Sequence, residues 1–346
     1  MIYFNSDYLE GAHPAIMTRL METNMVQTVG YGEDEYCEAA REKIKSACQA
    51  PEADVHFLVG GTQTNTTVIA AILRPWQGVL SAVSGHINCH EAGAIESTGH
   101  KVITLPTNNG KITAQQVRDY VEWHKNDEST EHIVQPGMVY ISFPTEGGTL
   151  YSKAELTALY GTCKQYGLPL FIDGARLGYG LVADGNDITL PELARLCDVF
   201  YIGGTKVGAL FGEAVVIMNE TLKKDFRFIM KQRGGRLAKG RLLGIQFDAL
   251  FTDDLYLTIS RHAIDMAYQI REIFVSAGYP LLFDSPTNQQ YPILSDAELA
   301  EIGKHFGYEY WERVDETHSG VRFCASWATT QENVDALRAA VQALKK

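Results

Sequence analysis

The chain has 346 residues, of which 45% are hydrophobic and 21% are charged, and its formal net charge is −12. These fractions are typical of a globular protein with room for one large and one smaller domain. The acidic balance argues against a nucleic-acid partner, and no apolar run approaches the roughly 18 residues that would cross a membrane. We therefore expect neither nucleic acid nor membrane as a partner.

The six cysteines are scattered along the chain and show no C-x-x-C spacing. Such spacing favours reduced thiols over disulfides or a zinc site. The amino terminus has neither a basic region nor a long apolar core, so no secretory signal is visible. We therefore expect a cytoplasmic protein without a metal site. The cysteines are Cys37, Cys48, Cys89, Cys163, Cys197 and Cys324.

In the first part of the chain, apolar spacing predicts helices at 13–24 and 36–49. A strand at 55–59 then runs into Gly60-Gly61-Thr62, and a helix follows at 65–73. A strand, a glycine pair, a hydroxyl residue and a helix can present backbone N–H groups and a positive helix end to a phosphate. A tight turn capped by Thr62 is the alternative.

The middle of the chain alternates strands and helices, with capping boxes at Thr113 and Ser152 and a stop at Gly167. This alternation predicts an α/β fold, with a mostly parallel sheet that carries helices on both faces. The expected elements are strands at 79–83, 138–143, 169–172, 199–202 and 213–218, and helices at 114–124 and 153–166.

Two of these buried strands run into residues that could take part in catalysis. The strand at 169–172 runs into Asp173-Gly-Ala-Arg176, and the strand at 199–202 runs into Gly203-Gly-Thr-Lys206. Ligands of open α/β sheets bind beyond the carboxyl ends of the strands. A carboxylate beside a cationic ring nitrogen and a lysine able to form a Schiff base are what pyridoxal 5′-phosphate (PLP) chemistry needs. Alone, Asp173 could cap a turn and Lys206 could be a surface lysine; together they favour a site.

The last part of the chain has a different rhythm. A basic segment at 231–241 is either a solvated loop or an anion contact, for which a neighbouring subunit's phosphate is one candidate. We place a boundary near residue 250, with a large domain at 1–250 and a small C-terminal α+β domain at 251–346. The expected elements of the small domain are a helix at 252–277, strands at 280–283, 290–293, 309–314 and 321–325, and helices opened by Ser295 and Thr329.

These residues match a family. The sequence resembles the low-specificity L-threonine aldolases, in the β-eliminating lyase branch of the aspartate-aminotransferase-like, fold type I PLP enzymes. The resemblance runs almost end to end. It is carried by Ser6-Asp7, Tyr31-Gly-Glu-Asp34, Gly61-Thr-Gln-Thr-Asn65, His86 with Glu91, Asp173-Gly-Ala-Arg-Leu177, Lys206 and Arg322.

The resemblance implies a role for each matching residue. Lys206 bonds covalently to PLP, Asp173 pairs with its ring nitrogen, and His86 stacks on its ring. Gly60, Gly61 and Thr62 hold the phosphate, and Thr205 and Arg176 neighbour the cofactor. The residues implied to bind substrate are Ser6, Tyr31, Arg176 and Arg322, of which Arg322 is the best carboxylate clamp.

The implied reaction is retro-aldol cleavage of L-threonine or L-allo-threonine to glycine and an aldehyde. A base must remove the β-hydroxyl proton; His86 or a water near it is the candidate, and His90 a weaker one. The alternatives are β-elimination or racemisation of another amino acid, and a non-catalytic scaffold. The resemblance also implies a homodimer or homotetramer, because fold type I sites usually form between subunits.

The sequence departs from the family pattern in three places. The family carries Asn-Thr-His-Asn after the strand that ends here at Phe143, whereas this chain has Pro144-Thr-Glu-Gly-Gly148. The family's Gly-Gly-Gly-Met-Arg-Gln segment here reads Arg233-Gly-Gly-Arg-Leu-Ala-Lys239. Val207 follows Lys206 where a glycine is usual. These changes predict a divergent subgroup with a PLP site and an altered substrate pocket.

Overall fold

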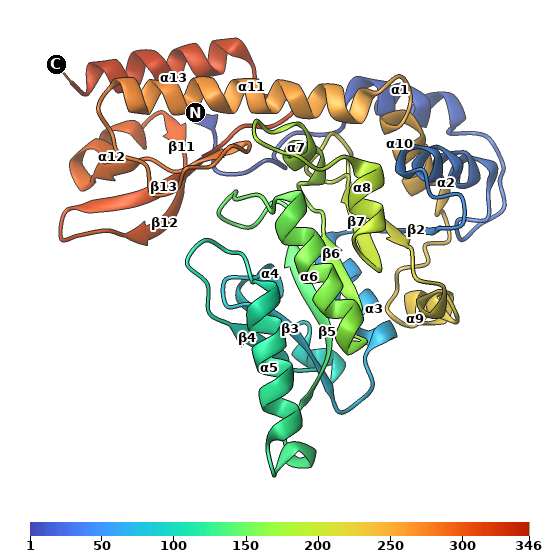
Figure 1. Ribbon diagram of the computed structural model, residues 1–346. Coiled ribbons are helices and arrows are strands. Elements are labelled where there is room, and N and C mark those ends of the chain that lie inside the picture. The colour runs from blue at the N-terminus through green and yellow to red at the C-terminus, as the bar shows by residue number, and fades with distance from the viewer. Residues whose placement is uncertain (346) are drawn as a thin grey trace.

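The computed structural model describes residues 1–345 and has a seven-stranded sheet at its centre (Figure 1). Strands β3 to β7 run parallel to one another, and β8 pairs antiparallel with β2 and β7. The expected mostly parallel α/β sheet is confirmed. Its strands, in spatial order, are β2 (Asp54–Leu58), β8 (Glu213–Ile217), β7 (Val199–Gly203), β6 (Leu170–Asp173), β5 (Gln135–Ser142), β3 (Gln77–Ala82) and β4 (Val102–Leu105).

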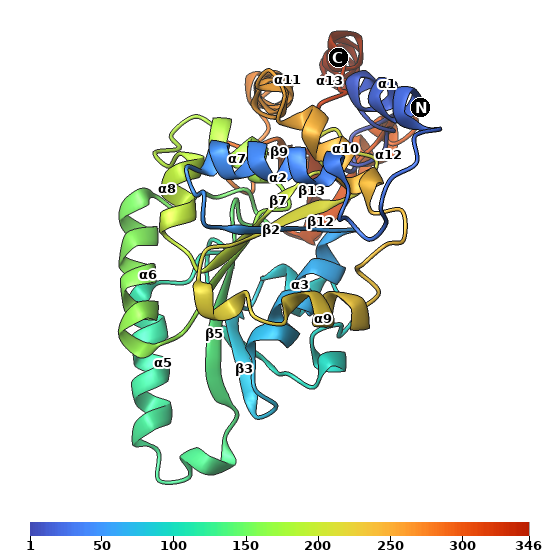
Figure 2. The ribbon, with the colours of Figure 1, turned by 90° about the vertical axis from the view of Figure 1, so that its right-hand side faces the viewer.

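Helices cover both faces of this sheet, as Figure 2 shows. Side chains alternate between the faces along each strand, so in β5 Val139 and Ile141 join one hydrophobic core and Met138 and Tyr140 join the other. The helices of this part of the chain are α1 (Pro14–Thr23), α2 (Glu35–Cys48), α3 (Gly61–Ile72), α4 (His86–Cys89), α5 (Ala114–Asn126), α6 (Lys153–Tyr166), α7 (Leu177–Val182), α8 (Leu190–Arg195), α9 (Phe226–Gln232) and α10 (Arg241–Leu250), with 3₁₀ turns η1 (Glu96–Thr98), η2 (Thr130–His132) and η3 (Glu220–Leu222).

The helix ends follow the local sequence closely. Capping boxes open α5 at Thr113 and α6 at Ser152, and α6 ends at Gly167 in the left-handed region (φ 68°). Helix α3 begins at Gly61, four residues before the expected start at 65. Glycine is a poor helix former, so we expected Gly61 and Thr62 to lie in a loop before the helix. In the structure they form the first turn of the helix.

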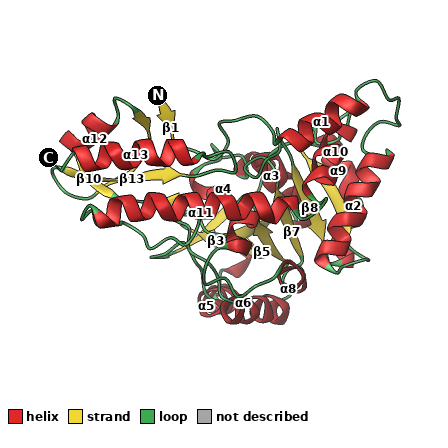
Figure 3. Ribbon diagram, turned by 90° about the horizontal axis from the view of Figure 1, so that it is seen from above, coloured by secondary structure: helices red, strands yellow, loops and turns green. Residues whose placement is uncertain are grey.

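The C-terminal part packs the long helix α11 against a small antiparallel sheet (Figure 3). Its elements are α11 (Leu255–Ser276), β9 (Gln289–Gln290), β10 (Ile293–Ser295), α12 (Asp296–Ile302), β11 (Phe306–Gly307), β12 (Glu309–Arg313), β13 (His318–Cys324) and α13 (Gln331–Ala343).

Three expectations for this part are wrong. The expected strand at 290–293 is two short strands, β9 and β10, with Tyr291 and Pro292 between them. Residues 280–283 form no strand, because only Leu281 bridges to Pro292. Helix α13 is capped by Thr330, whose side chain accepts from the amide of Asn333. The hydroxyl of Thr329 is unavailable, since it accepts a hydrogen bond from the amide of Ser326 (2.8 Å).

The first residues of the chain pack into its C-terminal part. Strand β1 (Ile2–Tyr3) pairs in parallel with β11, and the Phe4 side chain packs against Phe306 and Phe323 in the C-terminal core. The division near residue 250 stays a prediction. Within residues 1–345, no helix is long and apolar enough to cross a lipid bilayer.

Candidate active site

A cavity of about 470 Å³ lies at the carboxyl ends of β5, β6 and β7, and residues of β12 and β13 line its other side. This volume is in the range of small-molecule sites. The cavity brings together most of the residues singled out in the sequence. Those that line it are Gly60, Gly61, Thr62, His86, His90, Asp173, Arg176, Thr205, Lys206 and Arg322.

Asp173 ends β6 at the floor of the cavity and is only 4% exposed. Its Oδ2 accepts hydrogen bonds from the hydroxyl of Tyr140 (2.6 Å) and the side-chain amide of Asn65 (3.1 Å). Its Oδ1 accepts from the Ala175 amide (3.0 Å) and from the hydroxyl of Tyr201. All four donors are neutral, so the carboxylate is fixed in place while its negative charge stays available to a cation.

The charges of the site suit this arrangement. Burial alone would raise the pKa of Asp173, but the charge of His86 and the tyrosine hydrogen bonds lower it overall, so the group is ionised. Burial and the neighbouring Arg176 charge lower the pKa of Lys206. A lowered pKa increases the fraction of neutral amine, which is the nucleophilic form of a lysine.

The backbone around Lys206 is held from several sides. The Tyr179 hydroxyl donates to the carbonyl of Lys206 (2.5 Å), and the Thr205 hydroxyl donates to Oε1 of Glu213 (2.8 Å). The other oxygen of Glu213 accepts from the amide of Gly204 (3.1 Å). Burial raises the pKa of Glu213 to about 8. The loop between β7 and β8 is therefore a fixed support for Lys206.

The first turn of α3 lies at the edge of the cavity. The N–H groups of a first helical turn have no partner inside the helix, and together with the helix dipole they attract anions. A methyl group added at Gly60 would meet no atom within 4 Å, whereas one at Gly61 would lie 3.2 Å from the Tyr201 hydroxyl. The turn at Gly60, Gly61 and Thr62 lines the cavity, and its backbone N–H groups suit a phosphate group.

Arg176 is anchored by a buried carboxylate. Its Nε and Nη2 donate to the two oxygens of Asp7 (2.7 and 3.0 Å), and the Asn288 side chain donates to the same Asp7 (2.9 Å). Burial alone would raise the pKa of Asp7, but the Arg176 charge holds it well below its usual range. Asp7, which comes from the N-terminal segment, therefore fixes the orientation of Arg176.

His86 belongs to a chain of hydrogen bonds that leads back to the floor. Its Nδ1 lies 2.8 Å from Oε1 of Glu91, and the same oxygen accepts from Asn65 (2.7 Å). Although burial lowers the pKa of His86, the Glu91 carboxylate and the Asp173 charge raise it overall. The ring of His90 is exposed, with its centroid 5.6 Å from that of His86.

Arg322 on β13 is buried but incompletely paired. Its Nη1 donates to Gln289 (2.9 Å), and its Nη2 donates to the Asn5 carbonyl (2.9 Å) and to the carboxylate of Glu309. Its Nε has no hydrogen-bond partner within residues 1–345. The buried hydroxyl of Ser6 is also without a partner in this part of the chain, and Ser6 does not line the cavity.

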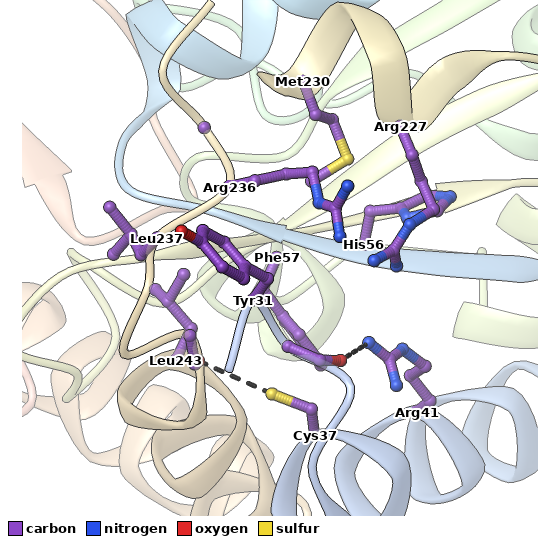
Figure 4. A pocket seen from close by; sticks show the side chains of 13 residues that line it. Tyr31, Cys37, Arg41, His56, Phe57, Arg227, Met230, Arg236, Leu237 and Leu243 are labelled. Carbon is purple, nitrogen blue, oxygen red and sulfur yellow. Dashed lines mark hydrogen bonds between the residues drawn. The ribbon is translucent and has the colours of Figure 1, made fainter. Parts of the chain in front are cut away.

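Tyr31 does not line this cavity. It lies in a separate pocket with Arg227 and Arg236 (Figure 4). Its ring centroid is 4.6 Å from Nζ of Lys231 and 5.7 Å from Cζ of Arg236. Its substrate role therefore stays a prediction that one copy of the chain does not test.

The basic residues of the segment at 231–241 have different partners. Arg241 donates to three carbonyl groups, that of Thr23 at the end of α1 and those of Asn24 and Val26 just after it (3.0, 3.0 and 2.6 Å). That arginine therefore closes the end of α1, whereas Lys231 and Arg236 stay beside Tyr31.

Sequence reasoning missed several polar groups of the site. Tyr140 and Tyr201 each lie two residues before the end of a strand, on the sheet face that also carries Asp173. Period-two alternation along the predicted strands could have found them. Glu146 lies in the segment at 144–148 that departs from the family pattern, but neither its carboxylate nor that of Glu213 at a strand start has a distinctive pattern of its own.

The cavity fits PLP. Asp173 can face a cationic ring nitrogen, Lys206 can supply the amine, and the first turn of α3 can hold a phosphate. Arg322 lines the opposite side of the cavity and can supply a guanidinium for a carboxylate partner. The donor set is that of a site for an anionic, amine-reactive cofactor and an amino acid.

Comparisons with known proteins give the same result. The family model of the β-eliminating lyases matches residues 4–339. The low specificity L-threonine aldolase of Pseudomonas aeruginosa is 30% identical over 334 residues, which cover 96% of this chain and 94% of that protein. The protein of that name from Saccharomyces cerevisiae is 25% identical over 287 residues, covering 81% of this chain and 72% of the yeast protein.

Solved structures place the fold in the same group. The Leishmania major threonine aldolase superposes with a TM-score of 0.97 at 42% identity, and the match covers 100% of both chains. A mutant aspartate aminotransferase of Thermus thermophilus, with a TM-score of 0.73 at 14% identity over 100% of this chain and 91% of its own, shares the fold type. The chain therefore belongs to the β-eliminating lyase family, as a fold type I lyase of the low-specificity L-threonine aldolase group.

Proposed function

We propose that this protein is a PLP-dependent aldolase that cleaves L-threonine and L-allo-threonine to glycine and an aldehyde. The observation that carries the proposal is the placement of Lys206, ionised Asp173 and incompletely paired Arg322 around one cavity. Lys206 would hold the cofactor covalently, Asp173 would face its ring nitrogen, and Gly60, Gly61 and Thr62 would hold its phosphate. Bound PLP supplies an acceptor for the electrons of the bond that breaks.

The chain's own residues determine which bond that is. Arg322 would bind the substrate carboxylate, and Arg176, held by Asp7, would stay beside the cofactor. Fixing the carboxylate orients the Cα–Cβ bond, and positioning of this kind can supply roughly 7–11 kcal/mol of the barrier reduction at best. His86 would stack on the cofactor ring, and its hydrogen bond with Glu91 would keep the imidazole ring in a fixed orientation.

The test is a product assay with both stereoisomers. Purified protein with PLP would be incubated with L-threonine or L-allo-threonine, and acetaldehyde would be followed with a coupled alcohol dehydrogenase. We expect acetaldehyde from the wild type and at least about a 10³-fold loss in Lys206→Ala, because the nucleophile is removed. Lys304→Ala, at an exposed position, is the matched control. Pyruvate or an inverted amino acid in place of acetaldehyde would move the assignment to β-elimination or racemisation.

We further propose a cytoplasmic homodimer or homotetramer. All six cysteines are free thiols, which supports a reducing compartment. Exposed apolar side chains gather on α1 and the loop after it, as expected for a surface that a second copy covers. They are Met17, Met21, Met25, Val26 and Val29. Light scattering after size-exclusion chromatography would give the assembly state.

A second copy would also explain the position of Tyr31. We propose that Tyr31 serves the cavity of a neighbouring copy, which a mixing experiment can test. Lys206→Ala and Tyr31→Ala would each be weakly active alone. Refolded together as dimers with random pairing, they should regain about one quarter of the wild-type sites, because half of the mixed dimers' sites carry neither change. No regain of activity would place Tyr31 outside the neighbour's site.

A further inference from the structure

The turn at 144–148, which follows β5, carries a carboxylate into the cavity. Glu146 lines the cavity together with Ser142, Asp173 and Lys206. Its Oε1 accepts hydrogen bonds from the Ser142 hydroxyl (2.6 Å) and from the backbone N–H of His86 (2.9 Å). Ser142 is the direct neighbour of Asp173 across the β5–β6 ladder. Glu146 therefore lies beside the floor of the cavity.

The backbone of Glu146 is tied to the opposite, C-terminal side. Its carbonyl accepts from the hydroxyl of Tyr291 (2.9 Å) and from the side-chain amide of Gln289 (3.4 Å). Gln289 is also the residue that accepts from Nη1 of Arg322. Glu146 thus lies between the floor, where Asp173 is, and Arg322, which would hold the substrate carboxylate.

The turn itself is rigid. The amide of Thr145 donates to the carbonyl of Thr149 (3.0 Å), and the amide of Gly148 donates to the carbonyl of Thr145 (2.9 Å). Gly148 has φ +81°, and a Cβ there would lie 2.1 Å from the Ser285 hydroxyl oxygen. Only glycine fits this position. The Glu146 side chain is therefore presented from a fixed backbone.

One oxygen of Glu146 is uncommitted. No hydrogen bond within residues 1–345 uses Oε2, and Oε2 is not among the buried atoms that lack a partner. It is therefore open to the cavity. The other carboxylates that line the cavity already have partners. Both oxygens of Asp173 and of Glu213 accept hydrogen bonds, and the exposed Glu309 forms an ion pair with Arg322.

We propose that Glu146 is a catalytic residue, whose Oε2 accepts the proton of the substrate's β-hydroxyl during cleavage. The O–H bond breaks and its electron pair becomes the second bond of the aldehyde carbonyl. The Cα–Cβ bond breaks and its pair stays with Cα, which is later protonated to give glycine. The proton leaves Glu146 for solvent between turnovers. This inference rests on the proposed aldolase function.

The electrostatics support this role over one for His86. Burial raises the pKa of Glu146 above its ordinary value, against the hydrogen bond from Ser142. A carboxylate with a raised pKa is a stronger base near neutral pH. The pKa of His86 is also raised overall, which favours its protonated form, and its Nδ1 is engaged with Glu91. The hydrogen bond to Glu91 therefore uses one ring nitrogen of His86, whereas Oε2 of Glu146 has no hydrogen-bond partner within residues 1–345.

The decisive test uses the holoenzyme of Glu146→Gln and two reactions. Cleavage of L-threonine needs a proton acceptor at the β-hydroxyl, whereas exchange of the glycine α-proton in D₂O, followed by NMR, does not. We expect kcat for cleavage to fall about 10²–10⁴-fold with KM nearly unchanged, while glycine exchange stays within a few fold of the wild type. Glu146→Asp, which keeps a carboxylate, should recover part of the cleavage rate and shift the acid limb of its pH profile.

A second measurement needs no turnover. Infrared difference spectra of the cofactor-free protein should show a carboxyl band that titrates above the ordinary glutamate range and is absent in Glu146→Gln. Glu128→Gln, at an exposed site outside the cavity, should leave the band and both reactions unchanged.

Three outcomes would overturn the proposal. They are undiminished cleavage by Glu146→Gln, equal loss of cleavage and glycine exchange, and spectra that do not differ between wild type and Glu146→Gln. Equal loss would assign Glu146 a purely structural role in holding His86 and Ser142. Absence of threonine cleavage by the wild type would instead remove the aldolase function, and this role would fall with it.

Discussion

The polar groups on the two sides of the cavity differ in how fully they are hydrogen-bonded. On the sheet side, Asp173 is surrounded by four neutral donors, two on each of its oxygens. On the C-terminal side, buried Arg322 keeps an Nε without a partner within residues 1–345. A carboxylate held by four hydrogen bonds keeps its orientation, whereas Arg322 makes three hydrogen bonds with its five N–H groups and lines the cavity where a ligand can approach. The sheet side thus suits a resident cofactor and the C-terminal side an exchanging substrate.

Asp7 connects the two sides, since it binds Arg176 after β6 and Asn288 in the C-terminal segment. We expect the largest effect on stability from Asp7→Asn, because it leaves the buried Arg176 charge without its partner. Breaking a buried ion pair typically costs about 3–5 kcal/mol of the free energy of unfolding. Urea denaturation at neutral pH would measure the loss.

The same variant has a defined pH dependence. Because Arg176 lowers the pKa of Asp7 in the folded state, the wild type's advantage is complete above the unfolded pKa of about 3.9. It should shrink as the pH falls below that value toward the lower folded pKa. The control is Asp265→Asn, which breaks an exposed pair with Arg261 and should change stability by less than about 1 kcal/mol. A pH-independent difference between Asp7→Asn and wild type would contradict this account.

Arg322→Lys tests the substrate side. Lysine keeps the positive charge but loses the planar fork that binds a carboxylate through two parallel hydrogen bonds. We expect KM for threonine to rise about 10- to 100-fold, as for the loss of a charged hydrogen bond, with a smaller change in kcat. Steady-state kinetics would measure both constants. Arg313→Lys, at an exposed pair on the neighbouring strand, should leave both unchanged. A fall in kcat at constant KM would contradict the carboxylate-clamp role.

Tyr140→Phe tests the sheet side and should have the smallest effect. It removes one of the four donors to Asp173 without changing the shape of the core. Losing one neutral hydrogen bond costs about 1 kcal/mol, so we expect a few-fold to tenfold lower kcat and a higher pKa of Asp173. The pH dependence of cofactor absorbance would follow that pKa. Tyr160→Phe, at a half-buried position away from the cavity, is the control, and equal effects in the two variants would contradict a specific role for Tyr140.

Much of the fold could be predicted because its determinants are local. Buried strands bounded by turns predicted the parallel sheet, and capping boxes at Thr113 and Ser152 predicted helix starts that the structure confirms. The ends of two strands pointed to Asp173 and Lys206, which line one cavity. Helix α3 has no such motif, and it starts at Gly61, four residues before the predicted position.

The sequence by itself thus determined most of the elements, the sheet type and the strand ends that carry the chemistry, because these follow from apolar spacing and capping motifs over a few residues. Only the tertiary structure decided which distant groups meet. It joined β1 to β11, brought Tyr140, Tyr201 and Asn65 to Asp173, turned Glu146 toward the cavity, and kept Tyr31 out of it. Such contacts depend on register and packing between segments far apart in the chain, for which no local pattern exists.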